Sequence, residues 1–251
     1  EASKIFNPNE IFRSDENVCT KAPNIEELEL SKNASYLHYC PNETIQGVAI
    51  HEIPKVNIPL IADMSSVILS QSLDVNKFSI IYAGAQKNIG PAGLTIVIIN
   101  KEFMQMGNEN LPNILKYSEH SKSNSMLNTP PTFSWYLAGK VFKWMIKLGG
   151  LDYFEEQNKL KASLLYDFID NSDFYINPID TSCRSIMNVP FVLKNSMLEK
   201  KFISEASDHG FLNLKGHRLV GGMRASIYNA MPLEGVKELI RFMDYFKSEN
   251  G

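Results

Sequence analysis

The chain has 251 residues, 44% of them hydrophobic, which is enough to bury a sizeable core as one large domain or two modest ones. The formal net charge of -3 and the lack of long runs of like charge exclude the basic surface typical of nucleic-acid binders. No apolar run reaches the length of about 18 residues that a membrane span needs, so we expect no nucleic-acid partner and no membrane partner.

The first expected elements are three short β-favouring runs, each followed by polar side chains. The runs cover residues 34–40, 60–62 and 80–83, and the polar residues that follow them are Thr44, Asp63, Gln86 and Lys87. Ligands of open parallel sheets bind just beyond the carboxyl ends of the strands. The sequence therefore predicts that these polar groups converge on a site in an α/β protein.

Lys87 lies in a loop of small residues between two β-rich runs, with Gly84 before it and Gly90 and Gly93 after it. A lysine on a surface loop is the ordinary interpretation of such a residue. However, a lysine held between buried strands is costly unless it is neutralised or bonded, and small neighbours leave room for a bulky group. A lysine that forms an imine fits this setting.

Asp63 allows two interpretations. Its side chain could cap the turn that begins with Ser65 and Ser66, as aspartate often does. Alternatively, a carboxylate paired with an imine-forming lysine could keep the ring nitrogen of pyridoxal phosphate protonated, so that the ring absorbs electrons from a carbanion. The residues alone leave both interpretations open.

The later part of the chain predicts mainly helices and then an α+β pattern. The expected elements are a short helix at 102–106, helices at 133–148 and 151–169, a strand at 186–193, a helix at 196–208, a pair of strands at 219–220 and 223–228, and a helix at 233–246. We expect a domain boundary within the second long helix, near residue 155.

A compact cationic group consists of His217, Arg218 and Arg224. A solvated charged loop is the ordinary interpretation. The alternative is a site for a doubly anionic substrate, because arginine binds phosphate and carboxylate oxygens bidentately. The histidines and cysteines show no spacing typical of a metal site, so we expect no metal.

Three cysteines, Cys19, Cys40 and Cys183, stand at wide and irregular spacings. An odd number at such spacings suits neither a disulfide framework nor a redox pair. We therefore expect reduced thiols in a cytoplasmic protein.

Four segments closely resemble the phosphoserine aminotransferase family, which belongs to the class-V aminotransferases. They are residues 39–44 (YCPNET), 83–93 (AGAQKNIGPAG), 128–133 (NTPPTF) and 215–230 (KGHRLVGGMRASIYNA). Gln86 before the lysine is informative, since the related cysteine desulfurases have a histidine there. The resemblance extends over roughly residues 34–251.

The resemblance implies an α/β fold of fold-type I pyridoxal phosphate-dependent transferases, which are homodimers. Residues 1–155 would be the C-terminal portion of the large cofactor-binding α/β domain, and residues 156–251 the smaller α+β C-terminal domain. The implied reaction moves an amino group between glutamate and 3-phosphohydroxypyruvate, giving O-phosphoserine and 2-oxoglutarate in serine biosynthesis. Bacterial members often also accept the 4-phosphohydroxythreonine precursor used in pyridoxine biosynthesis.

The resemblance also implies the roles of the residues around the cofactor, pyridoxal 5'-phosphate. Lys87 would form the imine with the cofactor aldehyde and carry the catalytic proton, and Asp63 would pair with the pyridine nitrogen. Thr44 would bond the ring hydroxyl side, and Gln86 would bond the cofactor phosphate.

Five further residues receive implied roles at the edges of this site. Asn128 and Thr129 would reach the phosphate of the neighbouring subunit's cofactor. His217 and Arg218 would receive the phosphate of the substrate, and Arg224 would be a nearby contact for its carboxylate or phosphate.

This sequence departs from the family at its beginning. Members carry about a hundred further residues before the point that matches Glu1, and these include the glycine-containing loop that holds the cofactor phosphate at a helix N-terminus. No glycine-rich phosphate loop of either common spacing occurs here. We therefore expect the chain to be the C-terminal two-thirds of such an enzyme, and two hypotheses follow. Either the parent protein is an active transaminase of which this sequence is an incomplete part, or the fragment exists as such and is a non-catalytic remnant that binds the cofactor poorly or not at all.

Overall fold

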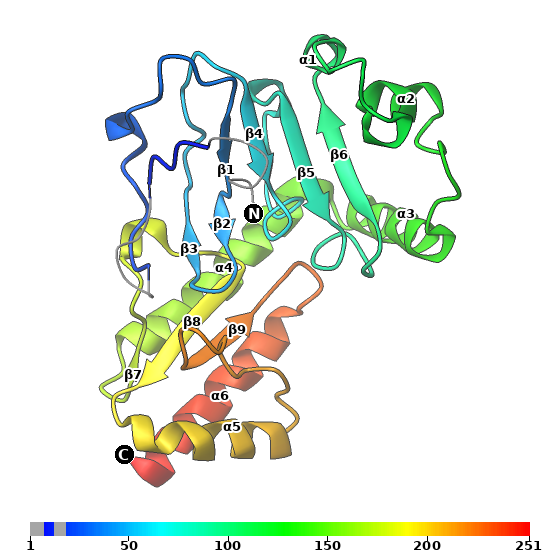
Figure 1. Cartoon of the computed structure of the whole chain (residues 1–251). Helices are drawn as coiled ribbons and strands as arrows, with labels where there is room; N and C mark the ends of the chain where they lie inside the picture. The colour runs from blue at the N-terminus through cyan, green and yellow to red at the C-terminus, as the bar shows by residue number, and fades with distance from the viewer. Residues whose placement is uncertain (1–7, 13–18) are drawn as a thin grey trace. The chain divides into compact units, whose positions relative to one another are not determined.

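The computed structural model describes residues 8–12 and 19–251, and the chain divides into two compact units. Residues 36–41 and 59–157 form the first, which we call the mixed-sheet unit. Residues 42–58 and 158–251, together with the described residues before 36, form the second, which we call the antiparallel unit. Figure 1 labels the elements of both units.

A four-stranded sheet is the centre of the mixed-sheet unit, with the strand order β1-β4-β5-β6. The strands are β1 (Leu37–Tyr39), β4 (Leu60–Asp63), β5 (Ile80–Gly84) and β6 (Thr95–Ile99). β1, β4 and β5 run parallel, and β6 pairs antiparallel with β5. Because β4 and β5 are parallel neighbours, their carboxyl ends lie at the same edge of the sheet.

The helices of this unit follow the sheet in the chain. They are α1 (Lys101–Gln105), α2 (Tyr117–Lys122), α3 (Thr132–Lys147) and the first turns of α4 (Gly150–Asp170), with 3-10 helices at Val75–Lys77 and Asn113–Leu115. α3 packs against the loop after β5: a Cβ at Gly90 would lie 3.6 Å from the backbone of Ala138. In the same contact, Ser134 Oγ donates a hydrogen bond to the carbonyl of Ala92 at 2.9 Å. The loop that carries Lys87 is therefore supported by a helix.

The antiparallel unit contains two small sheets and the C-terminal helices. Its elements are the hairpin β2 (Asn42–Glu43) and β3 (Val48–Ala49), the sheet β7 (Tyr175–Ile176), β8 (Asn188–Leu193) and β9 (Met223–Ser226), the rest of α4, α5 (Glu199–Asp208) and α6 (Leu233–Asn250), with 3-10 helices at Ile25–Glu27, Thr181–Cys183 and Ser196–Leu198. Aromatic rings fill its core. Phe202 is fully buried, and its ring centroid lies 5.8 Å from that of Phe191 and 5.0 Å from that of Phe246. These contacts join α5 and α6 to β8.

The hairpin of β2 and β3 is anchored on β8 by buried polar side chains. Asn42 Nδ2 donates to Asn188 Oδ1 at 3.0 Å, and Ser185 Oγ donates to Asn42 Oδ1. The turn of the hairpin contains Gly47 at φ +73°, where a Cβ would lie 2.6 Å from the carbonyl oxygen of Asn188 and would clash with Pro190. Only glycine allows both this backbone conformation and this close approach.

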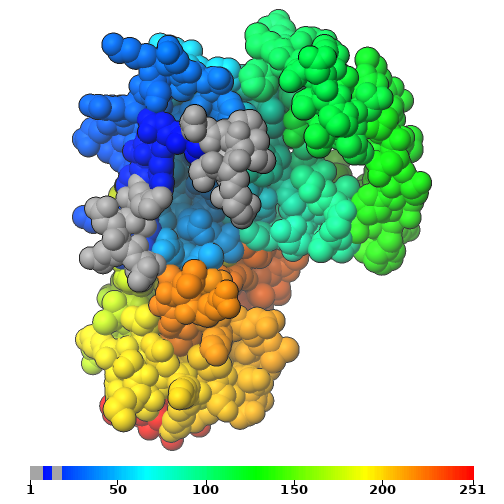
Figure 2. Space-filling view, viewed as in Figure 1, coloured from blue at the N-terminus to red at the C-terminus, as the bar shows by residue number. Residues whose placement is uncertain are grey.

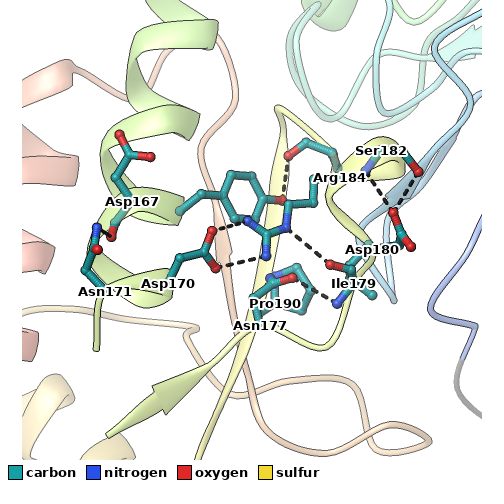
Figure 3. Close-up of polar contacts among 11 residues, drawn as sticks. Asp167, Asp170, Asn171, Asn177, Ile179, Asp180, Ser182, Arg184 and Pro190 are labelled. Carbon is teal, nitrogen blue, oxygen red and sulfur yellow. Dashed lines mark hydrogen bonds and ion pairs between the residues drawn. The ribbon is translucent and has the colours of Figure 1, made fainter. Parts of the chain in front are cut away.

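Arg184 ties the segment before β8 to α4, as Figure 3 shows. Its guanidinium donates to both carboxylate oxygens of Asp170 at 2.5 and 2.9 Å, and its Nε donates to the carbonyl of Ile179 at 3.2 Å. The same guanidinium lies 4.7 Å from the centre of the Tyr166 ring, whose hydroxyl donates to the carbonyl of Ser185 at 2.9 Å. Since Ser185 also bonds Asn42, the hydrogen bond from Tyr166 helps to hold the residues that anchor the hairpin on β8.

Most elements expected from the sequence are present. The helices predicted at 133–148, 151–169 and 233–246 correspond to α3, α4 and α6, the helix at 102–106 to α1, and the strand at 186–193 to β8. The helix predicted at 196–208 is a 3-10 turn followed by α5. No described helix is both long and apolar enough to cross a membrane.

The strand predicted at 219–220 is wrong. Residues 217–221 form a turn in which the amides of Val220 and Gly221 donate to the carbonyl of His217. The backbone φ angles of Gly221 and Gly222 are +72° and +60°, a left-handed conformation that strands do not adopt. The strand expected at 223–228 is confirmed over its first four residues, as β9.

The division of the chain differs from the expected one for residues 42–58 and for the described residues before 36. We expected residues 1–155 to form one domain, whereas residues 42–58 and the described residues before 36 lie in the unit of the C-terminal residues, and the division falls between 157 and 158. The bonds of Asn42 to Asn188 and Ser185 are the physical reason. The assignment of 1–155 and 156–251 to the domains of an enzyme stays a prediction, and its residues 1–7 and 13–18 lie outside the described ones.

Candidate active site

Asp63 and Lys87 lie at the carboxyl ends of neighbouring parallel strands in the mixed-sheet unit. Asp63 is the last residue of β4, and Lys87 is in the turn that follows β5. Asp63 Oδ1 accepts a hydrogen bond from the amide of Ser65 at 2.9 Å, so the carboxylate does cap its own turn. The capping interpretation is therefore correct, and the second carboxylate oxygen is not needed for it.

The turn around Lys87 is fixed by its main chain. The amide of Ala85 donates to the carbonyl of Leu94 at 2.9 Å, and the amide of Gly90 donates to the carbonyl of Ala85 at 2.7 Å. Ala85 and Ile89 are fully buried, whereas Lys87 is half-buried and Gln86 is exposed. Buried neighbours thus hold the backbone in place while the lysine side chain keeps access to solvent.

Ser65 and Gly84 connect the two strand ends. The amide of Gly84 donates to Ser65 Oγ at 3.0 Å, and a Cβ at Gly84 would lie 2.5 Å from Gln86 Oε1. Ser65 was not among the residues predicted from the sequence as part of the site. A hydroxyl two residues after a strand-end aspartate is the signal that indicates it.

Thr44 and Arg224 form a second group, in the antiparallel unit. Arg224 is on β9, and its Nη1 donates to the carbonyl of Thr44 at 3.2 Å. Arg224 Nε is fully buried, and in the part of the chain that the structure describes no protein group accepts its hydrogen. Side-on binding of a carboxylate or phosphate uses the Nε and Nη2 edge of arginine. The contact of Nη1 with Thr44 leaves that edge for an anion.

Tyr228 and Asn188 support this group, although neither was predicted from the sequence. Tyr228 hydrogen-bonds the Thr44 side chain and accepts a hydrogen bond from Asn188 Nδ2 at 3.0 Å. Burial raises the pKa of Tyr228, and the bonds to Asn188 and Thr44 oppose this rise. The phenol therefore stays neutral, and its hydrogen bond helps to orient the Thr44 side chain.

His217 and Arg218 lie in the same unit, on a loop between Leu214 and β9. The base of the loop is closed by a hydrogen bond from the amide of Gly216 to the carbonyl of Gly222 at 2.8 Å. His217 is half-buried, and its Nδ1 accepts a hydrogen bond from the amide of Leu219 at 3.3 Å, whereas Arg218 is exposed. Because Nδ1 accepts this hydrogen bond, the ring hydrogen is on Nε2, which can donate it to a ligand.

The nine predicted site residues are thus divided between the two units. The mixed-sheet unit holds Asp63, Gln86, Lys87, Asn128 and Thr129, and the antiparallel unit holds Thr44, His217, Arg218 and Arg224. The expectation that three strand ends of one sheet converge is confirmed for the ends of β4 and β5. For Thr44 it stays a prediction. Thr44 follows β2, which pairs with β3 in a separate two-stranded sheet, and that hairpin is anchored on β8 by side-chain hydrogen bonds.

Asn128 and Thr129 are exposed in the segment between α2 and α3. Nothing in their own unit buries them. Among the described residues, no three histidine, cysteine, aspartate or glutamate side chains are grouped closely enough to hold a metal ion.

Comparison with known proteins gives consistent matches over almost the whole chain. The family model described as "Aminotransferase class-V" matches residues 11–239. The chain is 57% identical to phosphoserine aminotransferase of Acinetobacter baylyi over 228 residues, which cover 91% of this chain and 64% of the relative. It is 53% identical to that of Hahella chejuensis over 251 residues, covering 100% of this chain and 70% of the relative.

Solved structures give the same result. Phosphoserine aminotransferase from Bacillus circulans subsp. alkalophilus is 46% identical with a TM-score of 0.90, over 92% of this chain and 65% of that one. A pyridoxal phosphate-bound phosphoserine aminotransferase from Trichomonas vaginalis is 39% identical with a TM-score of 0.89, over 94% of this chain and 67% of that one. The chain spans 64% of the length of the Acinetobacter relative.

Proposed function

Because this chain belongs to the class-V aminotransferases, and within them to the phosphoserine aminotransferases, we propose that it catalyses amino-group transfer between glutamate and 3-phosphohydroxypyruvate, giving O-phosphoserine and 2-oxoglutarate. Its fold is that of the fold-type I aminotransferases. One observation carries the proposal: Asp63 and Lys87 end neighbouring parallel strands, where ligands of such sheets bind.

The residues of the mixed-sheet unit fit pyridoxal 5'-phosphate as the cofactor. Lys87, which is half-buried, supplies a primary amine for the cofactor aldehyde, in a turn whose backbone is fixed by buried neighbours. Asp63 supplies a carboxylate for the ring nitrogen, and Gln86 is an exposed amide for the phosphate. When bound, the cofactor supplies an electron sink for the carbanion formed at the substrate α-carbon.

The side chains of this chain have defined tasks in the proposed reaction. Lys87 Nζ is the base that takes the proton from the substrate α-carbon, and Asp63 keeps a proton on the cofactor ring nitrogen. Thr44 bonds the hydroxyl side of the ring. Both Asp63 and Thr44 are held by hydrogen bonds of their own, so they need no rearrangement to act.

Two cationic groups suit a substrate that carries a carboxylate and a phosphate. Arg224 offers its Nε and Nη2 edge to the α-carboxylate, which supplies the acceptor that the buried Nε lacks. His217 and Arg218 bind the phosphate from their loop. A substrate with only one anionic group would leave one of these two sites without a partner.

We also propose a homodimer in the cytoplasm. The segment from α2 to α3 exposes large apolar side chains, including Phe133 at 70%, Tyr136 at 61% and Ile146 at 74%. This segment, green in Figure 2, lies uncovered at the surface. A second copy would cover it and would bring Asn128 and Thr129 to the cofactor phosphate of its partner. None of the three cysteines, all of which are described, forms a disulfide.

The proposed activity is tested in two half-reactions. The purified chain, loaded with pyridoxal phosphate, is mixed with glutamate alone, which should remove the visible absorbance of the bound cofactor and release 2-oxoglutarate. Addition of 3-phosphohydroxypyruvate should then restore the absorbance and release O-phosphoserine. A chain that binds no cofactor and completes neither half-reaction would support the alternative, a fragment without catalytic activity.

A further inference from the structure

Asp63 belongs to a chain of hydrogen bonds that crosses three parallel strands. Asp63 on β4 and Tyr82 on β5 are directly opposite in register, so their side chains share one face of the sheet. The Asp63 carboxylate acts on the Tyr82 hydroxyl both through its charge and as a hydrogen-bond partner, and both effects raise the pKa of Tyr82. The Tyr82 hydroxyl also lies 2.9 Å from Nε2 of His38, which is on β1. All three residues belong to the mixed-sheet unit.

The chemistry of the three groups determines the direction of these bonds. An ionised carboxylate can only accept, so the single hydrogen of the Tyr82 hydroxyl is donated to Asp63. The phenol oxygen then accepts from His38, and the hydrogen of a neutral His38 ring must be on Nε2. The two rings also lie nearly parallel, with centroids 5.9 Å apart and planes at 22°. The order is therefore His38 to Tyr82 to Asp63.

The surroundings keep Tyr82 and His38 in these protonation states. Burial, and then the nearby Asp63 charge, raise the pKa of Tyr82 to about 12, so the phenol remains a donor; Cys40 and Tyr117 also face it and act in the same direction. Burial lowers the pKa of His38, although the Asp63 charge opposes this, so the ring is neutral at pH 7. A neutral His38 ring therefore places no positive charge beside the Asp63 carboxylate.

We propose that Tyr82 and His38 are positioning residues that hold the Asp63 carboxylate in one orientation. The amide of Ser65 binds Oδ1 at 2.9 Å, and the Tyr82 hydroxyl adds a second donor from the neighbouring strand. Two donors in different directions stop rotation of the carboxylate about its Cα–Cβ bond. This proposal rests on the proposed function, since the benefit of a fixed Asp63 is its pairing with the cofactor ring nitrogen.

The variant Tyr82→Phe tests the proposal, because it removes the hydroxyl and keeps the ring. In the protein without cofactor, NMR coupling constants of Asp63 should report a single χ1 rotamer in the wild type and averaging among rotamers in Tyr82→Phe. With cofactor, the dissociation constant of pyridoxal phosphate should rise about tenfold, the effect of one charge-assisted hydrogen bond. Tyr36→Phe is the matched control, since Tyr36 is 48% exposed beside β1, and both measurements should match the wild type.

The variant His38→Phe tests the contribution of His38 separately from that of Tyr82. It keeps a ring against Tyr82 but removes Nε2, so partial averaging of the Asp63 rotamer is expected, smaller than in Tyr82→Phe. An Asp63 side chain that keeps one rotamer in both Tyr82→Phe and His38→Phe would overturn the proposal. If the wild type binds no pyridoxal phosphate, the proposed function fails. The rotamer measurement still decides whether Tyr82 and His38 position Asp63.

Discussion

Arg224 and Thr44 are 180 residues apart in the chain, yet Nη1 of Arg224 donates a hydrogen bond to the carbonyl of Thr44 at 3.2 Å. The contact joins the turn of the hairpin to β9. It also turns the guanidinium so that a buried Nε, which no described protein group bonds, is left for a ligand. A residue assigned to the cofactor and a residue assigned to the substrate are therefore held by one another.

Replacement of Arg224 by lysine should weaken substrate binding. Lysine keeps the charge but cannot bind an anion side-on while it bonds Thr44, so about 1.5 to 3 kcal/mol of binding should be lost. We expect KM for 3-phosphohydroxypyruvate to rise about 10- to 100-fold. Steady-state kinetics measures it.

The control for this variant is Arg241→Lys. Arg241 is on α6 and bonds only Glu234 and Glu238 among the ion pairs described for it, at exposed positions. The KM of Arg241→Lys for 3-phosphohydroxypyruvate should match that of the wild type. An unchanged KM in Arg224→Lys as well would contradict the assignment of Arg224 to the substrate.

Gly47→Ala should destabilise the antiparallel unit by about 2 to 4 kcal/mol. The left-handed backbone at φ +73° costs an L-residue about 1 to 2 kcal/mol, and the clash with Pro190 and Asn188 adds a similar amount. Gly210→Ala is the matched control, because its φ is +87° but no atom lies within 4 Å of the added Cβ. Urea unfolding measures both free energies, and equal losses would show that Gly47 is selected only for its backbone conformation.

Arg184→Ala should lower the free energy of unfolding by about 1 to 2 kcal/mol, because it removes a bidentate pair with Asp170 and the contact with the Tyr166 ring. The arginine side chain is only 13% exposed, so water replaces these contacts poorly. Lys201→Ala is the control, since its pair with Glu205 is on the exposed surface of α5 and should contribute little. Thermal unfolding compares the two, and similar small losses would argue against a structural role of Arg184.

Lys161 should make stability depend on pH. Its ammonium is almost fully buried and donates to the carbonyls of Ile227, Tyr228 and Met231 at 2.9 to 3.0 Å. Burial lowers its pKa from 10.5 to about 8. Between these two values the unfolded chain binds more protons than the folded one, so stability rises with pH in this window.

The test compares the wild type with Lys161→Met. Near pH 7 the variant should be less stable by about 2 to 3 kcal/mol, because three buried carbonyls lose their donor. As the pH rises from 8 to 10, the wild type should gain stability relative to the variant, at most about 1.4 kcal/mol per pH unit. A difference that stays constant or shrinks over this range would contradict the lowered pKa.

The sequence predicted the elements whose signals are local. The positions of Asp63 and Lys87 at strand ends and the helices α3, α4 and α6 follow from residue patterns within short windows, because these signals need no distant partner. The capping of Ser65 by Asp63 was also foreseen as one of two interpretations.

The sequence could not predict features that depend on distant partners. The bond of Asn42 to Asn188 spans 146 residues, and it moves the hairpin with Thr44 into the antiparallel unit. Tyr82 and His38 read as ordinary β-favouring residues, and only the register of β4 and β5 shows their relation to Asp63. Gly221 and Gly222 interrupt an apolar run whose composition suggested a strand.

The most direct test of the central claim is to find which residue binds the cofactor. The chain is incubated with pyridoxal phosphate, reduced with borohydride, digested and analysed by mass spectrometry. The account predicts one pyridoxyl phosphate group on Lys87, and no stable label in Lys87→Ala. Label on another lysine, or equal labelling of wild type and Lys87→Ala, would contradict it.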